Sequence, residues 1–435
     1  MRQMKDSGIP WIGAIPHEWS VRKVRNIARR KTDKNKPDEQ VLSLYRELGI
    51  VIKSERDDNF NVTSENTDNY KFVEIDDIVV NKMKAWQGSI AVSSYQGIVS
   101  PAYYVYRIVS PGIYPWYVHY MLRCKAYLPE YRRLSGGIRL GQWDLSDDNF
   151  KSIPLPIPNT YDEQVRIANY LDSKCAQIDY IIEKQEAIIE RLKEYKLSVI
   201  TEAVTKGLDP NVEMKDSGLE WIGKTPAHWK VCKLKYLFAE GDNGLKIGPF
   251  GSAIKGKALE DGPYKIYNQA HLIENDFSLS RHYVSEETFI ELSNYAVKPG
   301  DVLFSMMGTV GKCQIMPDGY PDGIMDSHLL KARLNEKIIP EFFVYAYDKD
   351  LSYQVITQLL YKSNGTIMNG LNSSLLKNVV ITVPPISEQK QIVLEIADKA
   401  RRIDSIIGLI HNKVEKLREY KNTLIYEVST GKKEV

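Results

Sequence analysis

The sequence has no long hydrophobic run and few cysteines, and these absences exclude several classes of protein. No window approaches the roughly 18 apolar residues of a membrane span, and residues 1–13 have no apolar stretch like that of a secretion signal. The four cysteines lie far apart, and none has a Cys or His neighbour at zinc-binding spacing. We therefore expect a cytoplasmic protein without disulfides, zinc or membrane association.

Motifs for catalysis are missing as well. The sequence contains no GxGxxG or GxxxxGK[ST] phosphate loop, and its histidines show no HxxxH or HExxH spacing. The adjacent Pro384 and Pro385 lack the flanking residues of an NPPY or DPPY methyltransferase motif. A nuclease motif built from Asp318 and the EYK at 419–421 is disfavoured, because that EYK lies in a predicted helix. No catalytic or metal site is predicted.

The composition and length of the chain are typical of a globular protein with several domains. The chain has 435 residues, 43% hydrophobic and 26% charged, and its net charge is only +2. Such a length favours two to four domains. A nucleic-acid surface would therefore be a local patch, since the whole molecule carries no strong field.

What the sequence does contain is the same order of segments twice. Residues 4–21 recur as residues 214–231, residues 163–182 recur as 388–407, and residues 192–196 recur as 417–421. The best-matched positions pair Trp11 with Trp221, Gly13 with Gly223, Pro16 with Pro226 and Trp19 with Trp229. An internal repeat of this kind predicts two similar halves.

The sequence between these segments repeats more loosely and predicts a mixed α/β domain in each half, at about 20–158 and 230–385. Residues 76–92 resemble 300–316, and residues 97–108 resemble 323–334. Their short β-branched and aromatic runs, bounded by Gly, Asp, Asn and Pro, are typical of strands. Helix-like stretches follow at 115–134 and 340–360, and then a polar loop with glycine and a proline-rich exit.

Two long stretches, 162–206 and 387–430, have apolar residues at alternating spacings of three and four. Asp162 and Ser387 are the expected N-caps, and Gly207 and Gly431 the expected ends. Two matched stripes in one chain favour an intramolecular antiparallel coiled coil of roughly 60 Å; an intermolecular coiled coil is the alternative. The predicted seam is Leu171, Ile178, Ile182, Ile189 and Leu192 with Ile396, Ile403, Ile407, Val414 and Leu417.

This order of segments resembles the specificity (S) subunits of type I restriction–modification systems. The resemblance rests on the repeated SG(I/L)xWIGxxPxxW segment, the DEQ at 162–164 and SEQ at 387–389 after proline-rich exits, and the ID…LKEYK and ID…LREYK helices. Residues 246–256, 267–272 and 300–312 look like the family's target-recognition domains. The resemblance covers essentially the whole chain.

The resemblance implies a mixed α/β fold with two target-recognition domains. They are separated by two long helices that form an intramolecular antiparallel coiled coil with pseudo-two-fold symmetry. The implied parts are an N-terminal segment with target-recognition domain 1 (1–158), a central spacer helix (159–213), the repeated segment with target-recognition domain 2 (214–385) and a C-terminal spacer helix (386–435).

The implied function is non-catalytic: a DNA specificity subunit that binds a bipartite, asymmetric site on double-stranded DNA. Its expected partners are two methyltransferase (M) subunits and, where present, two restriction (R) subunits. No cofactor is expected in this chain, and S-adenosylmethionine is expected in the methyltransferase subunit. The helices, with Glu190, Lys193 and Arg418, are the expected docking surface, because two identical partners require matched surfaces. The alternatives are a stand-alone bipartite DNA-binding protein and a scaffold that does not touch DNA.

The candidate DNA-reading residues lie in polar loops beside glycines, because amide, hydroxyl and basic side chains can hydrogen-bond base edges. In the first domain they are Asn81, Lys82, Lys84, Gln87, Arg133, Ser135, Arg139 and Gln142. In the second they are Ser252, Lys255, Lys257, Gln269, His271, Lys362, Ser363, Asn364, Thr366 and Asn369. The run at 22–36, with eight basic residues and one acid, predicts either phosphate contacts or a solvated helix face.

Overall fold

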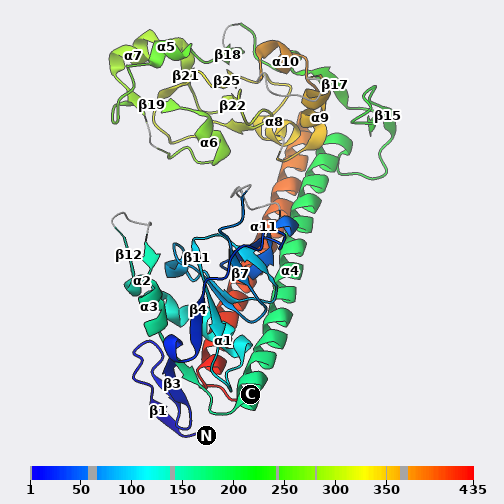
Figure 1. Ribbon diagram of the computed structural model, residues 1–435. Coiled ribbons are helices and arrows are strands. Elements are labelled where there is room, and N and C mark those ends of the chain that lie inside the picture. Colours follow the sequence, from blue (N-terminus) through cyan, green and yellow to red (C-terminus); the bar gives the residue numbers. More distant parts are fainter. Residues whose placement is uncertain are drawn as a thin grey trace. The chain divides into compact units, whose positions relative to one another are not determined.

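The chain forms two units that each combine a variable domain with parts of two long helices. A computed structural model describes residues 2–56, 66–137, 143–241, 244–279, 282–348, 350–362 and 371–435. Unit 1 comprises Met1–Glu186 and His411–Val435, and unit 2 comprises Ala187–Ile410. The helices α4 (Tyr161–Lys206) and α11 (Ile386–Ser429) contribute residues to both units (Figure 1).

Unit 1 is built on a four-stranded antiparallel sheet. Its strands are β1 (Met4–Asp6), β2 (Ala14–Pro16), β3 (Ser20–Lys23), β4 (Ala28–Lys31), β5 (Leu42–Tyr45), β6 (Gly49–Ile52), β7 (Lys71–Val73), β8 (Ile78–Asn81), β9 (Ile90–Val92), β10 (Gly97–Val99), β11 (Tyr103–Ile108), β12 (Ser135–Gly136), β13 (Asp144–Leu145) and β14 (Pro154–Ile157). Its other helices are α1 (Pro115–Arg123), α2 (Leu128–Leu134) and α3 (Asp147–Ser152). The sheet has the order β4-β11-β8-β9, and β1-β2, β3-β14, β5-β6, β7-β10 and β12-β13 form pairs.

Unit 2 contains the equivalent sheet and a second one. Its strands are β15 (Met214–Asp216), β16 (Lys224–Pro226), β17 (Lys230–Lys233), β18 (Leu245–Ile247), β19 (Tyr264–Tyr267), β20 (Tyr283–Val284), β21 (Ala296–Val297), β22 (Val302–Ser305), β23 (Cys313–Ile315), β24 (Gly323–Met325), β25 (Leu329–Ala332) and β26 (Val380–Val383). Its other helices are α5 (Gly251–Ile254), α6 (Gln269–Ile273), α7 (Glu286–Glu291), α8 (Pro340–Tyr347), α9 (Tyr353–Lys362) and α10 (Ser373–Lys377). The sheets are β18-β25-β22-β23 and β20-β19-β24-β21, with the pairs β15-β16 and β17-β26.

The loosely matched middle segments occupy the same places in the two principal sheets. Strands β8 and β9 come from the segment 76–92, and β22 and β23 from its counterpart 300–316. The last strand of each sheet in chain order lies between its first two, so β11 lies between β4 and β8, and β25 lies between β18 and β22. The units differ beside this sheet, because β10 pairs with β7 antiparallel whereas β24 pairs with β19 parallel. The predicted correspondence of the strands is therefore confirmed.

The predicted helix-like stretches are each broken into two helices. Residues 115–134 form α1 and α2, and residues 340–360 lie in α8 and α9. The break in unit 2 centres on Asp348, which is fully buried and accepts the backbone N–H groups of Cys313 and Asp350. Burial raises the pKa of the Asp348 carboxyl, and these bonds oppose that rise.

Within each unit α4 and α11 run antiparallel, and matched ion pairs join them. In unit 1 Lys421 Nζ lies 2.6 Å from Asp179 Oδ2, and in unit 2 Lys196 Nζ lies 2.7 Å from Asp404 Oδ2. The repeat relates these two pairs, since Asp179 matches Asp404 and Lys196 matches Lys421. Exposed pairs of this kind contribute about 0–1 kcal/mol each. They therefore favour one register more than they add stability.

The predicted seam positions lie on the inner faces of these helices. Leu171, Ile178, Ile182, Ile189, Ile396, Ile403 and Val414 are buried, and Leu192, Ile407 and Leu417 are partly buried. The predicted N-caps are wrong, because Asp162 and Ser387 already lie inside α4 and α11. Thr160 precedes α4, and its hydroxyl accepts the N–H of Glu163. The earlier start extends each helix back toward its proline-rich strand.

The glycines at the helix ends are where we predicted them. Gly207 and Gly431 follow α4 and α11 with φ of 80° and 71°, a conformation that favours glycine. A Cβ on Gly207 would lie 3.2 Å from Trp229, and one on Gly431 3.0 Å from Trp19. Each helix therefore ends against the repeated tryptophan of one unit.

The helix starts are fixed by a buried glutamine and a buried tryptophan. Gln164 accepts the N–H of Tyr114 and donates to the carbonyls of Gly112 and Pro158. Gln389 makes the equivalent three bonds, to Ile339, Lys337 and Pro384. Trp19 Nε1 donates to Glu163 at 3.2 Å, and Trp229 Nε1 donates to Glu388 at 3.0 Å. The glutamate and glutamine of DEQ and SEQ thus tie each helix to its own domain and repeated segment.

The N–H groups on one edge of β14 and of the equivalent strand β26 are accounted for in different ways. Pro154 and Pro156 on β14 have no N–H that needs an acceptor. The equivalent positions on β26 are Val380 and Thr382, whose N–H groups donate to the side chains of Gln358 and Gln354 at 2.9 Å. The two N–H groups of β26 therefore have acceptors at the positions where the prolines of β14 need none.

We predict that Gln389→Leu lowers the free energy of unfolding of the protein by about 3 kcal/mol, because it leaves one buried N–H and two carbonyls unpaired. Chemical denaturation followed by circular dichroism measures this change. Gln391→Leu is the matched control, since Gln391 lies exposed two residues along the same helix. Equal effects of the two substitutions would refute the role of the buried hydrogen bonds.

Candidate nucleic-acid interface

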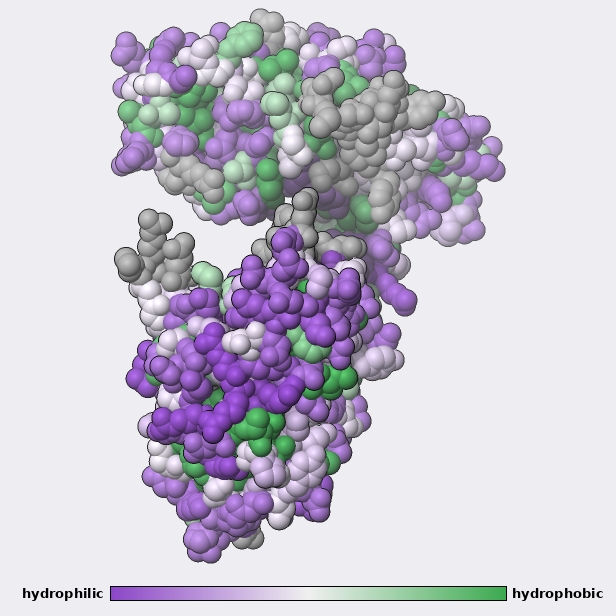
Figure 2. All heavy atoms as spheres, in the orientation of Figure 1, coloured by the Kyte–Doolittle hydropathy of each residue, from purple (hydrophilic) through white to green (hydrophobic). Residues whose placement is uncertain are grey.

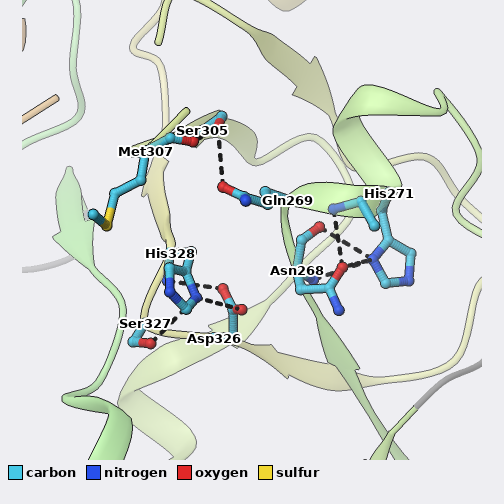
Figure 3. Close-up of polar contacts among 9 residues, drawn as sticks. Asn268, Gln269, His271, Ser305, Met307, Asp326, Ser327 and His328 are labelled. Atoms are coloured by element: carbon cyan, nitrogen blue, oxygen red, sulfur yellow. Dashed lines mark hydrogen bonds and ion pairs between the residues drawn. The ribbon is translucent and has the colours of Figure 1, made fainter. Parts of the chain in front are cut away.

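In unit 2 several loops meet where β22 ends and β25 begins, because Ser305 and Leu329 are register partners. The hydroxyl of Ser305 donates to Oε1 of Gln269 at 3.4 Å and lies 2.6 Å from Oγ1 of Thr309. Gln269 is partly exposed, at the start of α6. Figure 3 shows its amide pointing toward Ser305. The fixed amide leaves its NH₂ group available as a donor.

The loop between β24 and β25 borders this cluster. Asp326 Oδ1 accepts the N–H of His328 at 2.9 Å, and its Oδ2 lies 3.1 Å from Nδ1 of His328 (Figure 3). The carbonyl of His328 accepts the N–H of Met306, which joins this loop to the one after β22. The edge therefore presents the side chains of Gln269 and His328, beside the fully buried Ser305.

The prediction that His271 reads DNA is wrong. Its side chain is 1% exposed, and Nδ1 completes a capping box with Asn268. Its Nε2 lies 3.0 Å from the carbonyl of Leu279. Burial lowers the pKa of the imidazole, so the ring is a neutral structural group inside unit 2.

The equivalent edge of unit 1 carries Asn81 at the end of β8, opposite Tyr103. Asn81 hydrogen-bonds the Tyr103 side chain, and Lys82 Nζ lies 3.1 Å from Asp144 Oδ2. Gln87 Oε1 accepts from Arg46 at 2.7 Å. Asn81 and Lys82 thus lie at this edge, and these two residues and Gln87 already have partners.

The other predicted residues differ in whether their side chains are paired or exposed. Arg133 is paired with Glu130 through two bonds of 2.7 Å, and Ser135 donates to the carbonyl of Tyr131. Lys257 is paired with Glu291 at 2.6 Å. Arg133 is nevertheless exposed, as are Lys84, Ser252 and Lys255. Arg139, Gln142, Ser363, Asn364, Thr366 and Asn369 lie outside the described residues, as does the side chain of Lys362.

The basic run at 22–36 is a strand, a short 3-10 turn and β4, so its interpretation as a solvated helix face is wrong. Part of its charge is neutralised. Lys31 Nζ lies 2.7 Å from Asp77, and Arg30 lies 3.3 Å from Asp147. Arg30 also covers the ring of Tyr104.

Sequence reasoning missed an aromatic pair beside the candidate residues of unit 1. Trp86 and Trp143 pack edge to face with ring centroids 5.4 Å apart, and Arg132 lies over Trp86. The two tryptophans are 57 residues apart, so their spacing gave no signal. The QGS and GQW motifs around them were the only available hint.

Known proteins with similar sequences and folds indicate what class of protein this chain resembles. Residues 229–416 match the profile of the type I restriction modification DNA specificity domain. The chain is 22% identical to the EcoKI specificity subunit of Escherichia coli, over 73% of this chain and 66% of that protein. It is 24% identical to the MjaVIII specificity subunit of Methanocaldococcus jannaschii, over 83% of this chain and 82% of that protein.

Residues 229–416 thus match a type I restriction modification DNA specificity domain, and the chain is similar to type I specificity subunits over most of its length. Two solved structures share its fold. A chain from a study of complex assembly in a type I system gives a TM-score of 0.69 at 12% identity, over 95% of this chain and 98% of that one. The HsdS subunit from Thermoanaerobacter tengcongensis gives 0.51 at 12% identity, over 96% and 98%.

Specificity subunits are the non-catalytic, DNA-recognising members of their systems, and the residues described above fit this class. No helix among the described residues is long and apolar enough to cross a membrane. On the face drawn in Figure 2, hydrophilic side chains cover most of unit 1 and hydrophobic areas are small and separate. Polar side chains therefore dominate this face of unit 1.

The buried His271 predicts a pH dependence. Its pKa in the folded protein lies below the ordinary value near 6.5. The unfolded state therefore binds a proton that the folded state does not, and stability falls as the pH drops below about 6.5. His271→Gln should flatten the decline in unfolding free energy between pH 6.5 and 5 in urea titrations. The exposed His282 provides the control His282→Gln, and equal slopes in both variants would contradict the assignment.

Proposed function

We propose that this specificity subunit recognises a bipartite, asymmetric sequence on double-stranded DNA, one half-site with each variable domain. The observation that carries the proposal is that equivalent edges of two equivalent sheets present different polar side chains. Asn81 and Lys82 lie at one edge, and Gln269 and His328, beside the buried Ser305, lie at the other. A common framework with different reading residues suits a site whose halves differ in sequence.

In this proposal α4 and α11 form an intramolecular antiparallel coiled coil that relates the two domains by a pseudo-two-fold axis and sets the spacing of the half-sites. The matched ion pairs Asp179–Lys421 and Lys196–Asp404 support it. Half-sites read from one face of a duplex lie about one helical turn, ~34 Å, or a multiple apart. A stiff pair of helices is a suitable spacer.

The helices also offer matched surfaces for two copies of one partner, which we take to be the methyltransferase subunit. Ile181 and Tyr420 are exposed in unit 1, and their repeat counterparts Ile406 and Tyr195 are exposed in unit 2. In each unit the two residues lie within one turn of the ion pair that joins the helices. Exposed apolar side chains at repeat-related positions are what two identical partners would contact.

The remaining partners follow from the same proposal. S-adenosylmethionine would be held by the methyltransferase subunits and not by this chain. Two restriction subunits would join where the system includes them.

The deciding experiment is to co-express this chain with its methyltransferase partner and to map methylated adenines across the genome. We expect a split motif with two short, different blocks and a fixed gap, present only when this chain is present. If methylation does not change and the chain alone binds one sequence tightly, it is a stand-alone DNA-binding protein. Absence of both DNA binding and methylation would favour a scaffold.

We predict that Gln269→Ala alters the recognised bases of one half-site, and that Asn81→Ala alters the other. Loss of one well-placed base contact costs ~1–3 kcal/mol, roughly 5- to 150-fold in discrimination. Methylation mapping of each variant measures the change. Ser278→Ala, at an exposed position whose hydroxyl donates to Asp276 and not to the cluster, should leave the motif unchanged. A change in both half-sites from one substitution would contradict the division of labour.

We predict that Ile181→Asp and Ile406→Asp each remove one methyltransferase copy, and that the double variant removes both. A charge placed in an apolar contact is left without its hydration. Native mass spectrometry counts the bound copies. Glu190→Lys and Lys193→Glu test whether nearby charges take part in docking. Full assembly of the double variant would exclude this docking surface.

A further inference from the structure

Phe250 is the most exposed large hydrophobic residue of the described chain, with 88% of its surface accessible. It lies between the buried Pro249 and Gly251, immediately before α5. Apolar side chains that stand fully in water are usually partner contacts when they are held in place. The question is therefore what holds Phe250 and what lies next to it.

The segment that carries Phe250 is anchored on both sides. After it, Ala253 and Ile254 pack against the buried Ile266, Val284, Leu292 and Ile324. Before it, Gly248 donates its N–H to the carbonyl of Leu329 at 2.9 Å. A Cβ on Gly248 would lie 1.8 Å from the carbonyl oxygen of Asp326, so only glycine permits this close approach. The ring is thus presented on a fixed turn.

The anchoring partner is the loop of the candidate interface. Gly248 and Gly251 lie against Asp326 and Ser327, the loop that borders Ser305 and Gln269. Lys255 is exposed five residues after Phe250, and Met307, beside Ser305, is 54% exposed. A protruding aromatic ring, hydrogen-bonding side chains and a lysine therefore share one surface of unit 2. Polar and basic neighbours suit a nucleic acid better than an apolar protein surface.

We propose that Phe250 is a wedge that inserts between two base pairs of the half-site read by unit 2. Proteins that kink DNA use Phe, Leu or Met in this way, and the unstacked step adds specificity through the ease with which that step deforms. This inference rests on the proposed function, because it needs unit 2 to bind duplex DNA. In addition to hydrogen bonds from Gln269, unit 2 would recognise how easily one base step of the DNA deforms.

The test uses the complex of this chain with its methyltransferase partner and a duplex of the mapped site. The fluorescent base 2-aminopurine replaces single bases along the half-site of unit 2, apart from the methylated adenine, because methyltransferases flip their target base. We expect fluorescence to rise severalfold at one step on binding. Phe250→Ala should abolish the rise and weaken binding roughly tenfold, whereas Phe250→Leu should retain part of both effects.

Ile290→Ala is the matched control, because Ile290 is 65% exposed on α7 of the same unit. Unchanged fluorescence and affinity in Phe250→Ala, with normal methylation of the site, would overturn the wedge and leave the proposed function standing. Loss of methyltransferase binding in Phe250→Ala would instead make the residue a protein contact and equally overturn it. If the wild-type complex does not bind the duplex, the proposed function itself fails.

Discussion

The hydrogen bonds of one buried glutamine in each unit are the constraint on which the rest of the structure depends. Gln164 and Gln389 lie one turn inside the long helices and bond to the segment that leads into α1 or α8. In each glutamine the side-chain oxygen accepts one backbone N–H and the side-chain NH₂ group donates to two carbonyls. Three bonds in fixed directions allow only one arrangement of the surrounding backbone. The adjacent glutamate holds the repeated tryptophan. Together these residues fix the angle between a helix and its variable domain.

The two units reach the same backbone arrangement with different chemistry. In unit 1 the hydroxyl of Tyr117 lies 2.7 Å from the carbonyl of Pro156 on β14 and 2.9 Å from that of Ser429, near the end of α11, and shares its one proton between them. In unit 2 the hydroxyl of Thr382 donates to Val204, the matched carbonyl near the end of α4, at 2.6 Å. The prolines of β14 and the glutamines facing β26 are a second example. The framework thus requires a satisfied hydrogen bond at each place, not a particular residue.

This tolerance has a functional consequence. The framework residues are inside, and the edge that ends β8 or β22 is free to vary, because its side chains do not set the angle between helix and domain. Side chains at that edge are held by one another, as Ser305 holds Gln269 and Asp144 holds Lys82. In the function proposed above, prior fixing of such a group would reduce the entropy lost when it binds DNA.

The sequence by itself determined the twofold order of segments, the correspondence of the strands, the long helices with their seams and glycine ends, and the resemblance to type I specificity subunits. Those features follow from local periodicity and repetition, which a single chain displays directly. Tertiary structure alone decided which loop residues face outward. His271 and Lys255 look alike as basic residues in polar loops, yet one is buried in a capping box and the other is exposed. The pairing of Trp86 with Trp143 and the projection of Phe250 depend on contacts between distant segments, and no local pattern encodes such contacts.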